Sequence, residues 1–170
     1  MATPTTLPAS FNAGAILTAA QMNNLRGAFR VLQVVSTAPF TNATNSTNVA
    51  ADTGMSLSIT PTSATSKVLV LVNHSNVWKS AANAGNAVQI TLLRGASAIY
   101  FITTAAAYTN SLDQNMITVS GVYLDSPATT SATTYKTQFN NTANTAQVAI
   151  GYSIGTGVPQ SSMTLLEISA

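Results

Sequence analysis

The sequence predicts an all-β protein: a jelly-roll-like antiparallel sandwich of about eight or nine strands, with an N-terminal extended arm and one short helix. Two observations lead to this fold class. After residue 30, short segments rich in β-branched and aromatic residues recur at regular intervals, separated by loops rich in Gly, Asn, Ser, Thr and Pro. No helical pattern lies between these segments, which favours a sandwich. With this many strands we expect a jelly roll, and the alternative is an immunoglobulin-like sandwich.

The chain divides into an arm with an anchoring helix, residues 1–30, and a β-sandwich knob, residues 31–170. Pro4 and Pro8 lie in the arm, where their fixed φ and missing amide donors favour an extended backbone. We expect an arm of this kind to gain order mainly by lying on another protein.

A capping box marks the start of the helix, because Thr18 is followed three residues later by Gln21. Apolar residues then recur at spacings of three and four, forming one stripe. Two arginines four residues apart share one side of the helix, which is either solvated or faces an acidic surface of a partner. A helix this short is marginal alone, so we expect it to dock on its own domain or on a partner. The candidate docking residues are Met22, Leu25, Arg26, Phe29 and Arg30.

The strands are predicted from alternation of apolar and polar residues. Met55, Leu57 and Ile59 alternate with hydroxyl residues, the pattern of a half-buried strand. Residues 68–72 are apolar throughout, which predicts a central strand covered on both faces. A turn at Gly95 separates two further segments. The nine predicted strands are residues 31–35, 55–60, 68–72, 88–92, 99–102, 117–124, 135–139, 148–150 and 163–168.

The composition excludes several function classes. Only 6% of the residues are charged, with six Lys and Arg, four Asp and Glu, one His and no Cys, against roughly a quarter charged in an ordinary domain. Six scattered bases do not predict nucleic-acid binding, which needs many phosphate contacts. The absence of cysteine excludes disulfides, zinc fingers and thiol catalysis. No apolar run approaches the length of a membrane span.

Few residues are candidates for catalysis or metal binding. His74 is the only possible general base, and we expect it to be a histidine at a strand end with a local hydrogen bond. No two of the four acidic residues lie within ten positions of each other, so neither a glycosidase pair nor a calcium loop is indicated. We therefore predict no enzyme activity, catalytic residue, cofactor or metal, and a hydrolase acting through His74 is the weakest alternative. The four acids are Asp52, Asp113, Asp125 and Glu167.

Aromatic residues leave a carbohydrate-binding role open. Trp78 lies beside Lys79 in a stretch predicted to be a loop, residues 73–83, and could stack on a sugar. The alternative interpretation is that Trp78 packs at a domain or subunit interface, where tryptophan is favoured.

Several segments resemble one family of viral proteins. Residues 17–25 (LTAAQMNNL) are similar to the start of many small phage virion proteins. Nearly all of residues 31–170 resembles a knob module found in bacteriophage tail-fibre and minor structural proteins. The matching segments are residues 52–61 (DTGMSLSITP), 92–95 (LLRG), 123–136 (YLDSPATTSATTYK) and 162–168 (SMTLLEI).

The resemblance implies a jelly-roll-like knob that forms a homotrimer on the virion surface, without catalytic residues. Fibre proteins usually carry a long shaft before the knob, whereas about 30 residues precede it here. We therefore expect a structural protein of a tailed phage, assembled in the bacterial cytoplasm. It would be a trimeric capsid decoration or cement protein docked on the major capsid protein or a tail protein. The alternative is a short tail-fibre knob that binds host surface glycan through Trp78.

Overall fold

The computed structural model describes residues 14, 16, 30–37, 42–143, 146–157 and 159–169. In this part of the chain the fold is an all-β sandwich, as predicted, with ten strands and no helix. The strands are β1 (Val31–Ser36), β2 (Ala43–Asn45), β3 (Ala51–Ile59), β4 (Lys67–Lys79), β5 (Val88–Arg94), β6 (Ser97–Ala106), β7 (Asn115–Asp125), β8 (Thr133–Asn141), β9 (Val148–Ile150) and β10 (Ser162–Ile168).

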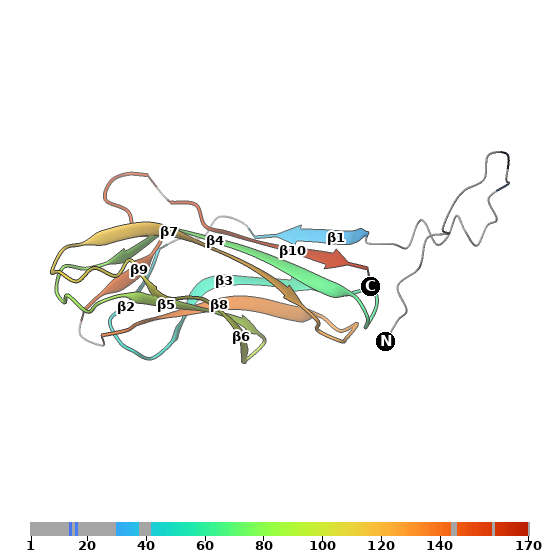
Figure 1. Cartoon of the computed structure of the whole chain (residues 1–170), viewed down its shortest axis with the longest axis horizontal. Helices are drawn as coiled ribbons and strands as arrows, with labels where there is room; N and C mark the ends of the chain where they lie inside the picture. Colours follow the sequence, from blue (N-terminus) through green and yellow to red (C-terminus); the bar gives the residue numbers. More distant parts are fainter. Residues whose placement is uncertain are drawn as a thin grey trace.

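The strands form two antiparallel sheets that pack face to face (Figure 1). Sheet A has the order β1-β10-β4-β9-β2, with β7 pairing the other side of β4, and sheet B has the order β3-β8-β5-β6. Strands β10 and β9 share one side of β4 in succession: β10 pairs its first half and β9 its last two residues. Without β2 and β9, the two sheets read β1-β10-β4-β7 and β3-β8-β5-β6. This is the order of a jelly roll rather than of an immunoglobulin-like sandwich.

The two sheets enclose a largely apolar interior, because alternate residues of each strand point inward. Strand β8 shows this most clearly, with every second residue buried from Thr133 to Asn141. One half of the core contains Met55, Ile59, Val68, Val70, Val72, Leu92, Tyr135, Met163 and Leu165. The other half contains Val77, Val88, Ile90, Ala106, Val119, Phe139, Val148 and Ile150.

The prediction of a central strand at residues 68–72 is confirmed, but the prediction that both of its faces are covered is not. Strand β4 lies between β10 and β7, and Val68, Val70 and Val72 are buried. Leu69 is only half-buried and Leu71 is 36% exposed. The prediction that both faces are covered is therefore wrong within this chain, because only the inner face of sheet A packs on sheet B.

Other differences concern polar segments. Strand β4 continues to Lys79, so most of the stretch predicted to be a loop, residues 73–83, is strand. The three-residue strand β2 has no counterpart among the nine predicted strands. The predicted turn at Gly95 is confirmed: Gly95 has a φ of 59° and lies between β5 and β6. Apart from residues 14, 16 and 30, the predicted arm and helix lie outside the described residues.

Candidate functional site

Strand β4 changes partners at its middle, and a hollow lies at that point. The β4–β7 register shifts between His74 and Val77, and Asn76 has a φ of 51°, a conformation that asparagine tolerates better than most residues. The segment after β9 follows β4 past this bulge: Gly151 N donates to Ser75 O (3.0 Å) and Tyr152 N donates to Asn76 O (3.1 Å). The Asn76 amide donates to Tyr152 O at 2.9 Å. Three hydrogen bonds therefore hold the bulge against the segment that follows β9.

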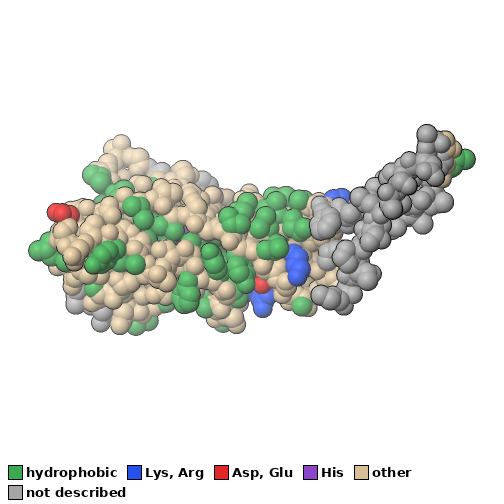
Figure 2. All heavy atoms as spheres, viewed as in Figure 1, with side chains coloured by type: hydrophobic (Ala, Val, Ile, Leu, Met, Phe, Trp, Pro, Cys, Tyr) green, Lys and Arg blue, Asp and Glu red, His purple; other side chains and the backbone are tan. Residues whose placement is uncertain are grey.

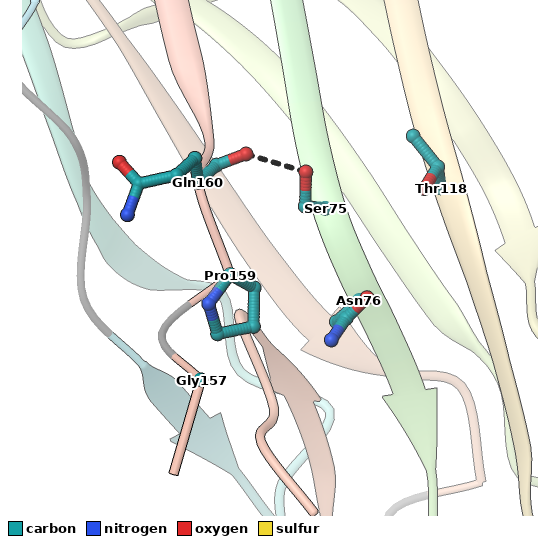
Figure 3. Close-up of a pocket in the computed structure, with 6 residues that line it drawn as sticks. All are labelled: Ser75, Asn76, Thr118, Gly157, Pro159 and Gln160. Carbon is teal, nitrogen blue, oxygen red and sulfur yellow. Dashed lines mark hydrogen bonds between the residues drawn. The ribbon is translucent and has the colours of Figure 1, made fainter. Parts of the chain in front are cut away.

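The hollow is an open pocket of about 430 Å³. Ser75 Oγ donates to Gln160 O at 2.5 Å, which joins the two walls drawn in Figure 3. The lining side chains offer hydroxyl and amide groups and no ionisable group. Such a surface can hydrogen-bond a neutral polar ligand, but it contains no acid or base for catalysis. The lining residues are Ser75, Asn76, Thr118, Gly157, Pro159 and Gln160.

His74 is a core residue and not part of this pocket. Its side chain is fully buried, and its Nε2 lies 3.1 Å from Thr137 Oγ1 on β8. Thr137 Oγ1 lies 2.6 Å from Thr53 Oγ1 on β3, so a polar bridge crosses the sandwich. Burial lowers the pKa of His74 to about 4, which keeps the ring neutral at physiological pH. The predicted strand-end position is wrong, because the histidine lies inside β4. Thr137, which contacts its Nε2, is 63 residues away in the sequence.

Asp125 lies at the centre of an ion-pair group at the edge of the core. Arg94 Nη1 donates to both Asp125 oxygens, at 3.0 and 2.9 Å. Tyr135 Oη donates to Asp125 Oδ2 at 2.6 Å. Burial and the neighbouring Asp125 carboxylate raise the pKa of Tyr135, so the phenol remains a donor. Both Asp125 and Tyr135 are almost fully buried, and no substrate can reach them.

Glu167 is buried on β10 and accepts several hydrogen bonds. Gln33 Nε2 donates to Oε2 at 2.6 Å, and the Thr62 amide and hydroxyl donate to Oε1 at 2.7 and 2.8 Å. Burial alone would raise the pKa of Glu167, but these hydrogen bonds outweigh it and lower the pKa to about 2. The ionised carboxylate ties β1 and the loop after β3 to β10.

The two remaining acids lie on separate parts of the surface. Asp52 accepts from Lys136 at 3.0 Å and from Gln138 at 2.7 Å, and Asp113 accepts from Ser111 Oγ at 2.8 Å. Each of the four carboxylates thus has its own partners. Within the residues that the structure describes, no three His, Asp or Glu side chains come together as a metal site.

Trp78 lies inside β4 and is buried, with 5% of its surface exposed. Its ring stacks on Tyr152 with a centroid distance of 4.1 Å and an interplanar angle of 8°, and its Nε1 donates to Gln114 Oε1 at 3.1 Å. The position predicted in a loop is therefore wrong, because the polar residues before Trp78 form strand. The buried ring gives the glycan hypothesis no support at this residue, and that role stays a prediction.

The proposed docking residues are mostly outside the described part: Met22, Leu25, Arg26 and Phe29 lie there. Arg30 is described and exposed. Its amide donates to Ser169 Oγ and its carbonyl accepts from Ser169 N, both at 2.9 Å. Residue 30 is therefore fixed beside the end of β10, at one end of the sandwich (Figure 1).

No pattern in the sequence indicates the pocket. Ser75 and Asn76 stand in a polar run, and such a run predicts a loop rather than a bulge inside a long strand. Gln160 comes close to Ser75 only through the fold.

A search of the described residues for helices that could span a membrane finds none.

Comparisons with known proteins identify no family. No known protein family matches the chain, and no curated protein matches it. The crystal structure of the infectious bursal disease virus VP2 subviral particle is similar with a TM-score of 0.44 and 13% identity, over 79% of this chain and 32% of that one. A structure of the infectious bursal disease virus Gx strain gives a TM-score of 0.35 and 14% identity, over 81% and 36%.

The chain thus spans about a third of the length of these viral proteins. Neither is a bacteriophage tail-fibre knob, so the resemblance to that family stays a prediction from the sequence.

Proposed function

We propose that this protein is a structural component of a tailed-phage virion, a homotrimeric decoration or cement protein that docks through residues 1–30. The observation that carries the proposal is that the two ends of the sandwich differ. Residue 30 is fixed beside Ser169 at one end, and the loops of residues 46–50, 80–87 and 107–114 lie at the other (Figure 1). An anchor at one end leaves the opposite loops facing outward.

The use of the ionisable groups also supports a structural role. His74 bridges the sheets, Asp125 is held by Arg94 and Tyr135, and Glu167 joins three segments. Lys79 is fully buried, and its ammonium donates to Ser111 O at 2.9 Å. These groups stabilise the fold, and buried polar groups of this kind need such partners.

Copy number per virion is the first test of the proposal. Quantitative mass spectrometry against the major capsid protein should find hundreds of copies for a capsid decoration protein. A dozen or two copies would contradict decoration and indicate a tail appendage.

Deletion of residues 1–29 tests the anchor. The truncated protein should remain folded, because β1 begins at Val31, but should no longer bind particles that lack the native protein. The full-length chain is the control. Particle binding by the truncated protein would show that docking uses the sandwich instead.

The pocket favours a second candidate, a short tail-fibre knob that binds host glycan. Its hydroxyl and amide groups, including Asn76 and Thr118, suit neutral sugar hydroxyls. Glycan arrays with the full chain would test this, with Thr118→Ala expected to weaken binding. The absence of binding to any host surface glycan would exclude it.

A further inference from the structure

The outer face of sheet A carries two rows of apolar side chains close to residue 30. In the first row, β1, β10, β4 and β7 each contribute one residue, and each residue pairs with the next across the sheet. In the second row, one residue of β4 pairs with one of β7. Paired residues share one face of a sheet. We call these side chains the sheet A ladder: Val34, Leu166, Leu69 and Leu124 in the first row, and Leu71 and Val122 in the second.

The sheet A ladder is exposed, and none of its members is charged. Val122 is 62% exposed, Val34 57% and Leu124 55%. Figure 2 shows hydrophobic side chains gathered where β1 and β10 lie in Figure 1. A contiguous apolar face of this kind is typical of a surface that another segment covers.

The two borders of the ladder differ. On the side away from residue 30 the next row is polar: Asn73 pairs with Ser120, whose hydroxyl donates to Asn73 Oδ1 at 2.8 Å. On the other side, a single row separates the ladder from residue 30, which is hydrogen-bonded to Ser169. That row contains Ile168 and Lys67. The ladder therefore lies beside the point at which residues 1–29 join the sheet.

The segment before residue 30 has the pattern of a helix that needs an apolar surface. A capping box at Thr18 and an apolar stripe through Met22 and Leu25 predict this helix. Residues 17–29, which lie outside the described part of the chain, contain a single charged residue. A helix of this length is marginal alone in water, so the uncharged ladder is a surface that would stabilise it.

The connection to β1 is long enough to turn such a helix back over sheet A. The amide and carbonyl of Arg30 are bonded to Ser169, so the helix ends before Arg30. Gly27 is the residue type that most often follows the last turn of a helix, which leaves residues 27–30 for the reversal. Connections of about two to six residues are usual between a helix and a strand. A helix of residues 18–26 would therefore run back over the ladder.

The ladder has the dimensions of one helix. Four strands span about 19 Å, and residues 67–71 of β4 span about 13 Å. A helix of residues 18–26 would be about 14 Å long and about 10 Å wide. A face of this size is too small for a stable complex between separate proteins, which buries about 1,200–2,000 Å² in total. A covalently attached segment needs less area because its effective concentration is high.

We propose that residues 18–26 form a helix that packs on the sheet A ladder of the same subunit, with Met22 and Leu25 facing the sheet. The contact is intramolecular and apolar. It leaves residues 1–17 to reach another protein, and this last point alone rests on the proposed function.

A pair of introduced cysteines tests the contact in the full chain, which contains no cysteine of its own. Met22→Cys combined with Leu71→Cys should form a disulfide within one chain under mild oxidation, detected as a monomer of changed mobility in non-reducing electrophoresis. Asn24→Cys combined with Leu71→Cys is the matched control, because Asn24 lies on the opposite side of the predicted helix. The control pair should react about tenfold more slowly.

The same experiment identifies the other possible occupants of the ladder. Disulfides formed only between chains would show that a second copy covers the ladder, and this result would overturn the proposal. Equal rates for the two pairs, or no disulfide in either, would also overturn it. Circular dichroism of the reduced variants should match that of the wild type, because the substituted ladder residue is not part of the core.

Two deletions test the consequence for the surface. Deletion of residues 1–29 should uncover the ladder and increase the fluorescence of an added apolar dye, and Val122→Asp in the same truncated chain should reverse the increase. Deletion of residues 1–17 should leave dye binding at the level of the full chain. Equal dye binding by all of these proteins would contradict the proposal. Neither dye binding nor the disulfide depends on particles, so the helix position and the proposed function fail separately.

Discussion

The hydroxyl of Tyr135 is a single group whose contribution to stability can be isolated. The Tyr135→Phe substitution keeps the buried ring and removes only the hydrogen bond to Asp125 Oδ2, which is 2.6 Å long. Hydrogen bonds to charged groups contribute about 1.5–3 kcal/mol. Asp125 retains its two contacts with Arg94, so no carboxylate is left without a partner. We expect the free energy of unfolding to fall by about 2 kcal/mol.

Urea denaturation at one fixed protein concentration measures this change, and in a thermal scan about 2 kcal/mol corresponds to a Tm lower by about 4–8 °C. Tyr108→Phe is the matched control, because Tyr108 is 51% exposed and its hydroxyl lies 3.5 Å from Asn110 Oδ1. The control should change stability by less than about 0.5 kcal/mol. A loss below that value for Tyr135→Phe would refute the assigned role of the ion-pair group.

Three further perturbations follow from the same structure. Burial lowers the pKa of His74 to about 4 from an ordinary 6.5, so as the pH falls the unfolded chain binds a proton before the folded chain does. The free energy of unfolding should therefore decrease between pH 6.5 and pH 4. Urea denaturation at several pH values in that range should show a weaker pH dependence for His74→Gln than for the wild type. Burial alone would raise the pKa of Glu167, but its hydrogen bonds lower the pKa to about 2 from 4.5. The stabilisation of the folded state by the ionised carboxylate should therefore be complete above pH 4.5 and disappear as the pH falls through 2. Glu167→Gln should remove this dependence on acid in a titration followed by circular dichroism. A Cβ at Gly121 would lie 2.9 Å from Ile102 Cγ2, so Gly121→Ala should cost about 1–3 kcal/mol in urea denaturation, and adding Ile102→Ala should cost less than the sum of the single changes.

Each of these has a distinct contrary outcome. An unchanged pH slope in His74→Gln would mean that the histidine is solvated. Acid unfolding of Glu167→Gln identical to that of the wild type would mean that its hydrogen bonds do not persist. Full additivity of the two substitutions at Gly121 and Ile102 would mean that these residues do not touch.

Alternation predicted most of the sandwich from the sequence. In β3, Met55, Leu57 and Ile59 point inward and alternate with exposed serines, so the pattern alone identified that strand. The pattern failed where polar residues face inward. His74 and Asn76 interrupt β4, and nothing local shows that Thr137 and Tyr152 supply their partners from distant strands.

The burial of Trp78 and the exposure of Leu71 were also beyond sequence reasoning. Both residues are in β4, yet one is covered by Tyr152 and the other remains on the outer face. Their environments depend on which strands and loops cover each face, and this is a tertiary property. The pocket was missed for the same reason, since Ser75 and Gln160 are far apart in the sequence.

The pairing of β1 with β10 determines how the sandwich bears mechanical load. Residue 30 leads directly into β1, and five register pairs, from Val31 to Ser36, connect that strand to β10. The hydrogen bonds of an antiparallel pair run perpendicular to the strands. A force drawing residue 30 away along the strand axis therefore shears all of these bonds together instead of opening them one after another. Strand β1 would then act as a tether whose strength comes from loading its bonds in parallel.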